Sequence, residues 1–108
     1  MIGIDLIGID RIKKACQSKV FLDNTFSFDE LEYAKGKGDF YQTLAGIFAA
    51  KEAVLKAVGT GIKDLCLNKV EIKRNENGQP HHKLDCGKQV FVSISHDGGF
   101  ATAVAMIV

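Results

Sequence analysis

Four charged residues stand where their side chains could bind a metal ion and phosphate groups. Asp5 interrupts an apolar N-terminal stretch, while Lys51, Glu52 and Lys56 lie close together in a segment with helical periodicity. Mg²⁺ commonly takes one or two carboxylates from a protein and completes its shell with water and substrate phosphates, and lysine side chains suit phosphate oxygens. Asp5 and Glu52 are therefore candidate metal ligands, and the two lysines are candidate phosphate ligands.

Each of these residues also has an ordinary structural explanation. Asp5 could cap the next helix or pair with a lysine, because a buried carboxylate needs such a partner. Glu52 and Lys56 could form a surface ion pair, which contributes about 0.3–0.5 kcal/mol on a helix. Lys51, near the middle of an apolar stripe, could bury its stem and extend its ammonium group to solvent. These residues alone leave both explanations open.

A histidine ends another candidate motif. Ser93-Ile94-Ser95-His96 closes a stretch with strand periodicity and precedes Gly98–Gly99, a position where a lone histidine is usually a turn residue. No serine lies in a nucleophile-elbow motif, and Gly59-Thr60-Gly61 lacks the lysine and the spacing of a Walker loop. Catalysis by a serine triad and Walker-type nucleotide binding are therefore not indicated.

The first elements that must position these residues can be predicted from periodicity and capping signals. Residues 2–7 alternate, with Gly3, Asp5 and Ile7 on one face, and this predicts a strand. Asp10 is then placed to cap a short basic helix that begins at residue 11.

Two further helices are expected. Ser27 and Glu30 fit a capping box and predict a helix over residues 28–35. Apolar residues at helical spacing predict a long helix over residues 43–58, and Gly59 is a natural C-terminal cap for it. This long helix would carry the candidate metal and phosphate ligands.

The second half of the chain has strand periodicity. Alternation predicts strands at residues 70–73, 82–84, 90–95 and 100–108, with a turn at 75–78 and a strand break at 96–99. Helices early and strands late favour an α+β fold, with a mainly antiparallel sheet packed against one long helix and short N-terminal helices. Residues 1–108 are expected to form a single domain.

Composition narrows the class of function. Hydrophobic residues make up 46% and charged residues 25% of the 108 residues, as in a folded domain, and the net charge of +1 argues against a general nucleic-acid binder. The N-terminal stretch lacks a basic leader and is too short to span a bilayer, so a cytoplasmic location is expected. The widely spaced Cys16, Cys66 and Cys86 are expected to be free thiols.

A domain this small has little room to enclose a large ligand, so a binding site shared between subunits is expected.

Three ordered motifs resemble the holo-acyl-carrier-protein synthase family, the short phosphopantetheinyl transferases. The motifs are Gly3-Ile4-Asp5 with Arg11-Ile12, Phe48-Ala49-Ala50-Lys51-Glu52-Ala53 continuing into Lys56-Ala57-Val58-Gly59-Thr60-Gly61, and Ser93-Ile94-Ser95-His96. They occur in the family's order with similar spacing, and the resemblance covers nearly the whole chain. It implies transfer of 4′-phosphopantetheine from coenzyme A to a serine of apo acyl carrier protein, a step of fatty-acid and lipid biosynthesis that releases adenosine 3′,5′-bisphosphate.

The resemblance also implies roles for individual residues. Asp5 and Glu52 match the family's magnesium ligands, and with Lys56 they form the expected catalytic set, in which Glu52 is the candidate proton acceptor for the carrier serine. The positions that match the coenzyme A site are Lys51, Lys56, Gly59, Thr60, Gly61 and His96. Arg11 matches a basic residue that meets the acidic carrier protein, and Lys14 is expected to assist it. Such proteins are typically homotrimers with the coenzyme in clefts between subunits.

The chain departs from the family at two places, and two other classes of function compete with the transferase. Ile47 stands where arginine is common, and residues 20–24 lack the several arginines often found there, so carrier docking is expected to depend on Arg11, Lys13, Lys14 and Lys19. One alternative is a catalytically inactive coenzyme A-binding subunit, which should lack one of the two carboxylates. The other is a structural oligomerising domain whose charged residues are solvated.

Overall fold

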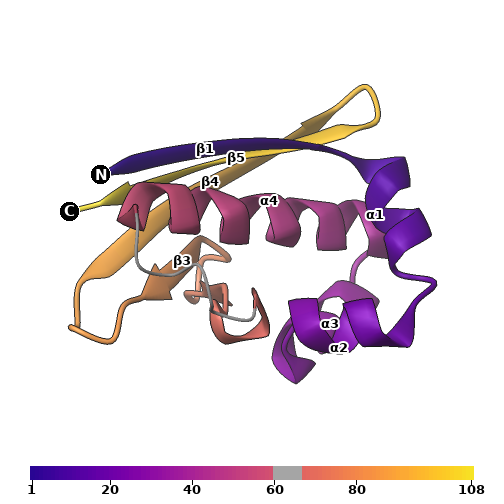
Figure 1. The fold of residues 1–108 in the computed structure, drawn as a ribbon, viewed down its shortest axis with the longest axis horizontal. Coiled ribbons are helices and arrows are strands. Elements are labelled where there is room, and N and C mark those ends of the chain that lie inside the picture. Colours follow the sequence, from indigo (N-terminus) through magenta and orange to yellow (C-terminus); the bar gives the residue numbers. More distant parts are fainter. Residues whose placement is uncertain (60–66) are drawn as a thin grey trace.

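A twisted sheet with a long helix packed on one face organises the chain in the computed structural model, which describes residues 1–59 and 67–108 (Figure 1). Within these residues the strands form a five-stranded antiparallel sheet in the order β1-β5-β4-β3-β2. The strands are β1 (Ile2–Gly8), β2 (Lys73–Arg74), β3 (Pro80–Lys83), β4 (Gln89–Asp97) and β5 (Phe100–Ile107). The helices are α1 (Ile9–Ala15), α2 (Lys19–Thr25), α3 (Phe28–Lys35), α4 (Phe40–Val58) and the short 3₁₀ helix η1 (Leu67–Lys69). The predicted α+β class, antiparallel sheet and long helix are confirmed.

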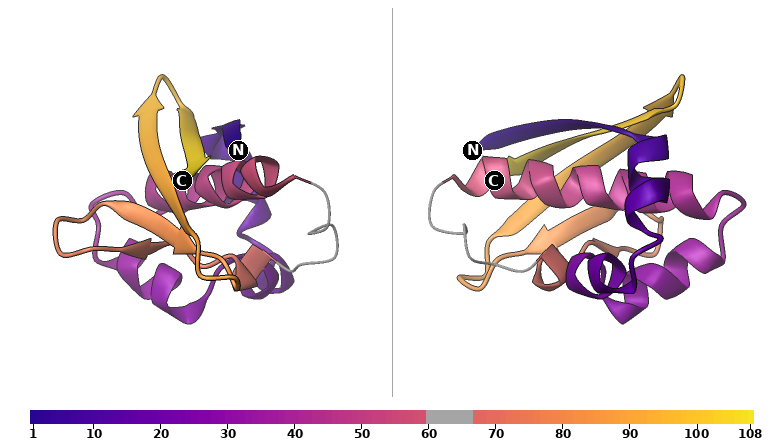
Figure 2. Two further views of the ribbon diagram at one scale, coloured as in Figure 1. Left: turned by 90° about the vertical axis from the view of Figure 1, so that its left-hand side faces the viewer. Right: turned by 45° about the vertical axis from the view of Figure 1, so that its right-hand side comes forward.

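Helix α4 lies along the sheet and packs on β1, β5 and β4, while α1 and α3 pack near its N-terminal half (Figures 1 and 2). Small side chains allow this close packing: the buried alanines are Ala49, Ala50, Ala53 and Ala57 on α4 and Ala101, Ala103 and Ala105 on β5. A Cβ atom at Gly3 would lie 1.9 Å from the carbonyl oxygen of Ala53. Strand β1 therefore reaches α4 only because residue 3 is glycine.

Capping residues explain where the helices begin. The capping box of Ser27 and Glu30 is present at the start of α3, as predicted. Helix α4 begins at Phe40, earlier than the predicted Thr43, because the Asp39 side chain accepts a hydrogen bond from the backbone N–H of Gln42. Helix α2 was not predicted; Ser18 caps it, and its side chain accepts from the N–H of Phe21.

The predicted cap of α1 is wrong. Gly8 occupies the N-cap position without a side-chain hydrogen bond, and Asp10 lies inside the first turn. The backbone N–H of Ile9 instead donates to the carbonyl of Gly99 at 2.9 Å. The turn between β4 and β5 therefore satisfies the first N–H group of the helix, and no side chain caps it.

The predicted strand at residues 70–73 is also wrong, since only Lys73 belongs to a strand. Three backbone groups of this segment contact side chains. The N–H of Ile72 donates to Glu30, the carbonyl of Val70 accepts from Lys51, and the carbonyl of Glu71 contacts the Nδ1 atom of His82 at 2.8 Å. Alternating Val and Ile therefore reflect burial here, with no strand pairing.

The hairpins are close to their predicted positions. The turn at 75–78 is confirmed by a 2.9 Å hydrogen bond from the N–H of Gly78 to the carbonyl of Asn75. Strand β4 runs on through His96 and Asp97, past the expected break, and turns at Gly98 and Gly99, whose φ angles of 56° and 85° favour glycine. None of the helices in the described ranges is long and apolar enough to cross a membrane.

Candidate active site

Asp5 and Lys56 meet at the edge of the sheet where β1 passes α4. The Lys56 ammonium group lies 3.2 Å from Asp5 Oδ1 and donates to the carbonyl of Ile4 at 3.0 Å. The backbone carbonyl of Asp5 accepts from Thr102 Oγ1 at 2.8 Å, which holds this part of β1 to β5. The Asp5 side chain is 15% exposed and that of Lys56 is 56% exposed. Asp5 is therefore a fixed, largely buried carboxylate, and Lys56 is a more accessible partner.

Glu52 belongs to the same cluster. Burial raises the pKa of the Glu52 carboxyl, the negative charge of Asp5 raises that pKa further, and the positive charge of Lys56 partly opposes the rise. The two carboxylates therefore repel each other, and Lys56 only partly compensates. The structure places Asp5 and Lys56 in direct contact, and the charges of both act on Glu52. The roles predicted for these three residues stay predictions.

The donor chemistry of this cluster fits Mg²⁺. No group of three or more His, Cys, Asp or Glu side chains in the described part of the chain could hold a metal ion by itself. Two carboxylates suit Mg²⁺, since this cation usually binds through one or two carboxylates plus water and substrate phosphates. A bound cation would also relieve the repulsion that raises the Glu52 pKa. The identification of Asp5 and Glu52 as metal ligands stays a prediction.

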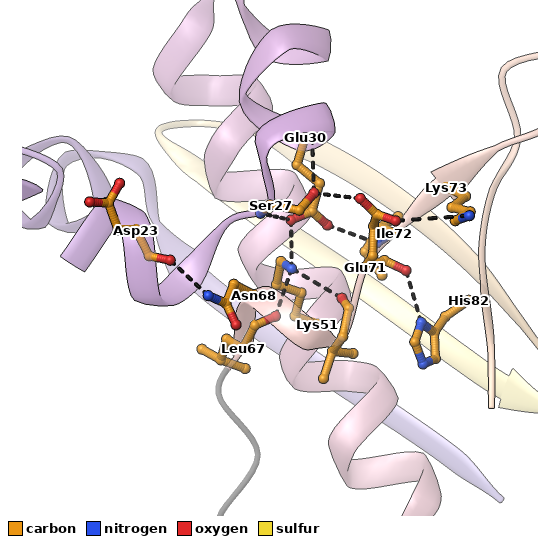
Figure 3. Close-up of polar contacts among 11 residues, drawn as sticks. Asp23, Ser27, Glu30, Lys51, Leu67, Asn68, Glu71, Ile72, Lys73 and His82 are labelled. Carbon is orange, nitrogen blue, oxygen red and sulfur yellow. Dashed lines mark hydrogen bonds and ion pairs between the residues drawn. The ribbon is translucent and has the colours of Figure 1, made fainter. Parts of the chain in front are cut away.

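Lys51 has a different environment from the one predicted. Its side chain is fully buried, and its Nζ atom lies 2.6 Å from Glu30 Oε1, 2.8 Å from the Leu67 carbonyl oxygen and 3.0 Å from the Val70 carbonyl oxygen (Figure 3). An ammonium group has three donor hydrogens, and these three acceptors use all of them. The structure contradicts the assignment of Lys51 as a coenzyme ligand, and it also contradicts the alternative of an ammonium group in solvent.

Glu30 is the centre of this buried network. Its carboxylate accepts from the N–H of Ser27 at 2.8 Å and from the N–H of Ile72 at 2.7 Å, in addition to its ion pair with Lys51 (Figure 3). Burial lowers the pKa of Lys51, while the negative charge of Glu30 opposes that shift. Sequence reasoning recognised Glu30 only as a capping residue, because nothing in the spacing links residue 30 to residue 51.

The glycine end of α4 is described only in part. Gly59 ends the helix with a φ angle of 89°, a conformation that favours glycine, and its N–H donates to the carbonyl of Leu55 at 3.0 Å. This confirms Gly59 as the C-terminal cap. Thr60 and Gly61, the other predicted coenzyme contacts in this motif, lie outside the described residues.

His96 lies in a separate pocket. On β4 it faces Gly46 of α4, where an added Cβ atom would be 2.8 Å from His96 Nε2. The pocket has a volume of about 280 Å³ and is lined by Tyr33, Lys37, Thr43, Gly46, Arg74, Ile94 and His96. Gly46 precedes Glu52 by six residues on α4, a rise of about 9 Å along the helix. The chain does not place His96 beside Asp5 and Glu52.

Sequence reasoning missed the cations that share this pocket with His96. The Lys37 ammonium group lies 4.8 Å and the Arg74 guanidinium 4.5 Å from the centroid of the Tyr33 ring. Among the described residues no carboxylate lines the pocket, and the charges of Lys37 and Arg74 favour anions there. Lys37, Arg74 and His96 come from segments far apart in the sequence, and no motif connects them.

Two surfaces complete the description. Arg11 and Lys14 are both exposed on α1, which follows directly after the strand that carries Asp5. The face of the sheet opposite α4 carries exposed apolar side chains, which are Ile2, Ile4, Leu6, Phe91, Val104 and Met106. Docking of a carrier protein by Arg11 and Lys14 stays a prediction.

Comparison with known proteins shows which family the chain resembles over nearly its whole length. The family model described as the 4′-phosphopantetheinyl transferase superfamily matches residues 1–105. The chain is 39% identical to the holo-[acyl-carrier-protein] synthase of Fusobacterium nucleatum, with 98% of this chain and 96% of the relative covered. It is 42% identical to the synthase of the same name from Caldicellulosiruptor bescii, with 97% and 94% covered.

Solved structures agree with the sequence comparisons. The holo-[acyl-carrier-protein] synthase of Helicobacter pylori, in complex with coenzyme A, superposes with a TM-score of 0.84 at 35% identity and full coverage of both chains (100% each). The Bacillus anthracis synthase, in complex with coenzyme A (3′,5′-ADP), gives a TM-score of 0.83 at 37% identity, with 98% of this chain and 93% of that chain covered. The predicted resemblance and the prediction of a transferase enzyme are confirmed. On the matched fold, motifs and near-complete coverage, the chain belongs to the 4′-phosphopantetheinyl transferase superfamily.

Proposed function

We propose that the chain transfers 4′-phosphopantetheine from coenzyme A to a serine of apo acyl carrier protein in a magnesium-dependent reaction that releases adenosine 3′,5′-bisphosphate. The observation that carries this proposal is the cluster of Asp5, Glu52 and Lys56 where β1 meets α4. The names of the similar synthases, and the structures of some of them in complex with coenzyme A, suggest the substrate and the acceptor.

The cluster has the chemistry that phosphoryl transfer needs. Asp5 and Glu52 would hold Mg²⁺, which supplies positive charge to stabilise the pyrophosphate and the transferring phosphoryl group. Lys56 adds a second positive charge, and its exposed side chain can exchange the Ile4 carbonyl for a phosphate oxygen. Glu52 is proposed to accept the serine proton, directly or through a water bound to the metal ion.

Coenzyme A would extend from this cluster toward the glycine end of α4 and toward a cationic pocket. Gly59, Thr60 and Gly61 are proposed to approach its phosphates, because a glycine backbone leaves room for them. The pocket of His96, Lys37 and Arg74 suits an anionic part of the coenzyme. Since this pocket and Asp5 lie on different strands with β5 between them, a coenzyme bound between two subunits could contact both regions.

The exposed apolar sheet face supports the proposed homotrimer. Ile2, Ile4 and Leu6 are 67%, 61% and 64% exposed, and Met106 and Val104 pair beside the first two on β5. A contiguous apolar face of this kind usually marks a protein–protein interface. Light scattering should give a mass about three times 11.8 kDa. A monomeric mass would contradict the trimer and leave the chemistry of the cluster unaffected.

Arg11 and Lys14 are proposed to dock the carrier protein. Both are exposed on α1, and α1 begins four residues after Asp5. Positive charge beside the catalytic cluster would attract an acidic partner and orient its serine toward the transferring group.

Intact mass spectrometry tests the proposed transfer. An apo acyl carrier protein incubated with the chain, coenzyme A and Mg²⁺ should gain the mass of one phosphopantetheine, and a chelator should abolish the gain. The matched variant Glu52→Ala should also give no gain. Absence of transfer with several carriers, while coenzyme A still binds, would instead identify an inactive coenzyme A-binding subunit.

A further inference from the structure

Helix α4 is held on two sides within the single turn that carries Glu52. Lys51, Glu52 and Ala53 are consecutive, and successive residues of an α-helix point about 100° apart. Lys51 and Ala53 therefore face nearly opposite directions, with Glu52 between them. Contacts on the Lys51 and Ala53 sides together determine how far this turn can rotate about the helix axis.

The Lys51 side is held by directional polar contacts. Its ammonium group bonds to the Glu30 carboxylate on α3 and to the backbone carbonyls of Leu67 and Val70, and its side chain is 0% exposed (Figure 3). Glu30 is itself fixed by the N–H groups of Ser27 and Ile72. The acceptors that surround Lys51 are therefore anchored to the backbone of two other segments.

The Ala53 side is held by close backbone packing. Gly3 of β1 approaches so closely that an added Cβ atom would lie 1.9 Å from the Ala53 carbonyl oxygen and 2.6 Å from the Ala57 nitrogen. Asp5 lies two residues further along the same strand, on the same face. The contact that fixes Ala53 therefore also places Asp5 beside the helix edge that carries Glu52.

We propose that Lys51, paired with Glu30, is a positioning residue that fixes the rotation of α4 so that the Glu52 carboxylate faces Asp5. A buried ion pair adds little stability over well-packed apolar side chains, because its desolvation offsets much of its attraction. Apolar contacts are also non-directional, whereas three hydrogen bonds to anchored acceptors restrict rotation. The ion pair thus fixes the orientation of the Glu52 carboxylate, which must bind the same metal ion as the Asp5 carboxylate. This inference rests on the proposed magnesium-dependent transfer.

The test replaces the pair with apolar residues of similar size, in the double variant Glu30→Leu/Lys51→Met. The matched control is Glu32→Leu/Lys35→Met, the same exchange at an exposed ion pair of α3. Folding is checked by circular dichroism and thermal melting. Metal binding is measured directly, by electron paramagnetic resonance of free Mn²⁺ titrated with each protein and coenzyme A. Turnover is measured separately against Mg²⁺ concentration.

The double variant should fold and bind Mn²⁺ at least about tenfold more weakly, and its half-saturating Mg²⁺ concentration should rise in parallel, as when groups that orient metal ligands are removed. The control should match the wild type. A folded double variant with wild-type Mn²⁺ affinity would overturn the positioning role, and so would a wild type that binds no Mn²⁺. Wild-type Mn²⁺ binding without any phosphopantetheine transfer would instead overturn the proposed function alone.

If the double variant does not fold, a second variant tests the positioning role of the ion pair. Glu30→Asp keeps both charges and shortens the carboxylate side chain by one methylene, which draws the ion pair away from α4. Its Mn²⁺ affinity should fall by about threefold, between those of the wild type and a protein without the pair. A folded Glu30→Asp protein with unchanged Mn²⁺ affinity would refute the inference.

Discussion

Gly3→Ala should separate β1 from α4 and thereby disable the site. The added Cβ would lie 1.9 Å from the Ala53 carbonyl oxygen and 2.6 Å from the Ala57 nitrogen, both of which are backbone atoms. Backbone atoms within a packed helix cannot rotate away as a side chain can. To reach the 3.4 Å of an ordinary contact with the Ala53 oxygen, the strand must retreat by about 1.5 Å.

This retreat has a cost in stability and a larger cost in activity. Overpacking of this kind costs about 1–3 kcal/mol, which lowers the melting temperature of a domain of about this size by roughly 4–24 °C. Asp5 moves with the strand, so its 3.2 Å contact with Lys56 should lengthen beyond ion-pair range. Misplacement of reacting groups by about 1 Å can lower turnover about a hundredfold.

The assay combines thermal melting with carrier modification measured well below the melting temperature, so that loss of activity is not loss of fold. Gly38→Ala is the control, because a Cβ at Gly38 would meet nothing within 4 Å. Wild-type stability and turnover for Gly3→Ala would refute the claim that close backbone approach builds the site. Loss of stability with full activity would refute only the link from β1 to Asp5.

Three further predictions follow from the same geometry. In the presence of a chelator, Glu52→Gln should raise the melting temperature near neutral pH, because burial and the charge of Asp5 raise the pKa of Glu52 and wild-type stability falls as pH rises through that pKa. The difference should vanish below the carboxyl's ordinary pKa of 4.5, and a difference independent of pH would contradict this origin. Lys51→Met alone should lower the free energy of unfolding by about 3–5 kcal/mol in urea titrations, since it leaves a buried carboxylate without its counter-charge. A change below about 1 kcal/mol would mean that the ion pair is not buried in solution. Arg11→Glu combined with Lys14→Glu should raise the KM for the carrier at least about tenfold, with a smaller change in kcat and a smaller effect at high salt; an unchanged KM would exclude α1 as the docking helix.

Local sequence patterns predicted which residues share a strand face near the site and where helix α3 begins. Alternation along residues 2–7 predicted that Gly3, Asp5 and Ile7 share a face, and Gly3 and Ile7 are indeed buried against the helix side while Ile4 is exposed. The capping box at Ser27 predicted α3 at its observed bounds. These features depend on neighbours within a few residues, which a sequence displays directly.

Long-range partners were beyond the reach of those patterns. The alternation at residues 70–73 predicted a strand, yet Lys51 and Glu30 take the backbone groups of Val70 and Ile72. Likewise, the pocket at His96 combines Lys37, which follows α3, with Arg74 of β2, and neither shares a spacing rule with His96. A side chain that bonds to a distant backbone overrides the local periodicity, and only the tertiary structure reveals the exchange.

The buried position of Lys51 changes what its place in an apolar stripe implies. A lysine amid apolar residues suggested either an exposed ammonium group or a ligand for phosphate, but both explanations assume that the charge must reach the surface. The structure satisfies the charge internally, with Glu30 at 2.6 Å and two backbone carbonyls. Lys51 and Glu52 are therefore adjacent charges with opposite tasks: one fixes the helix from within, and the other is presented at its edge. A motif that pairs a buried cation with a neighbouring, half-buried carboxylate can thus encode the orientation of a site as well as its chemistry.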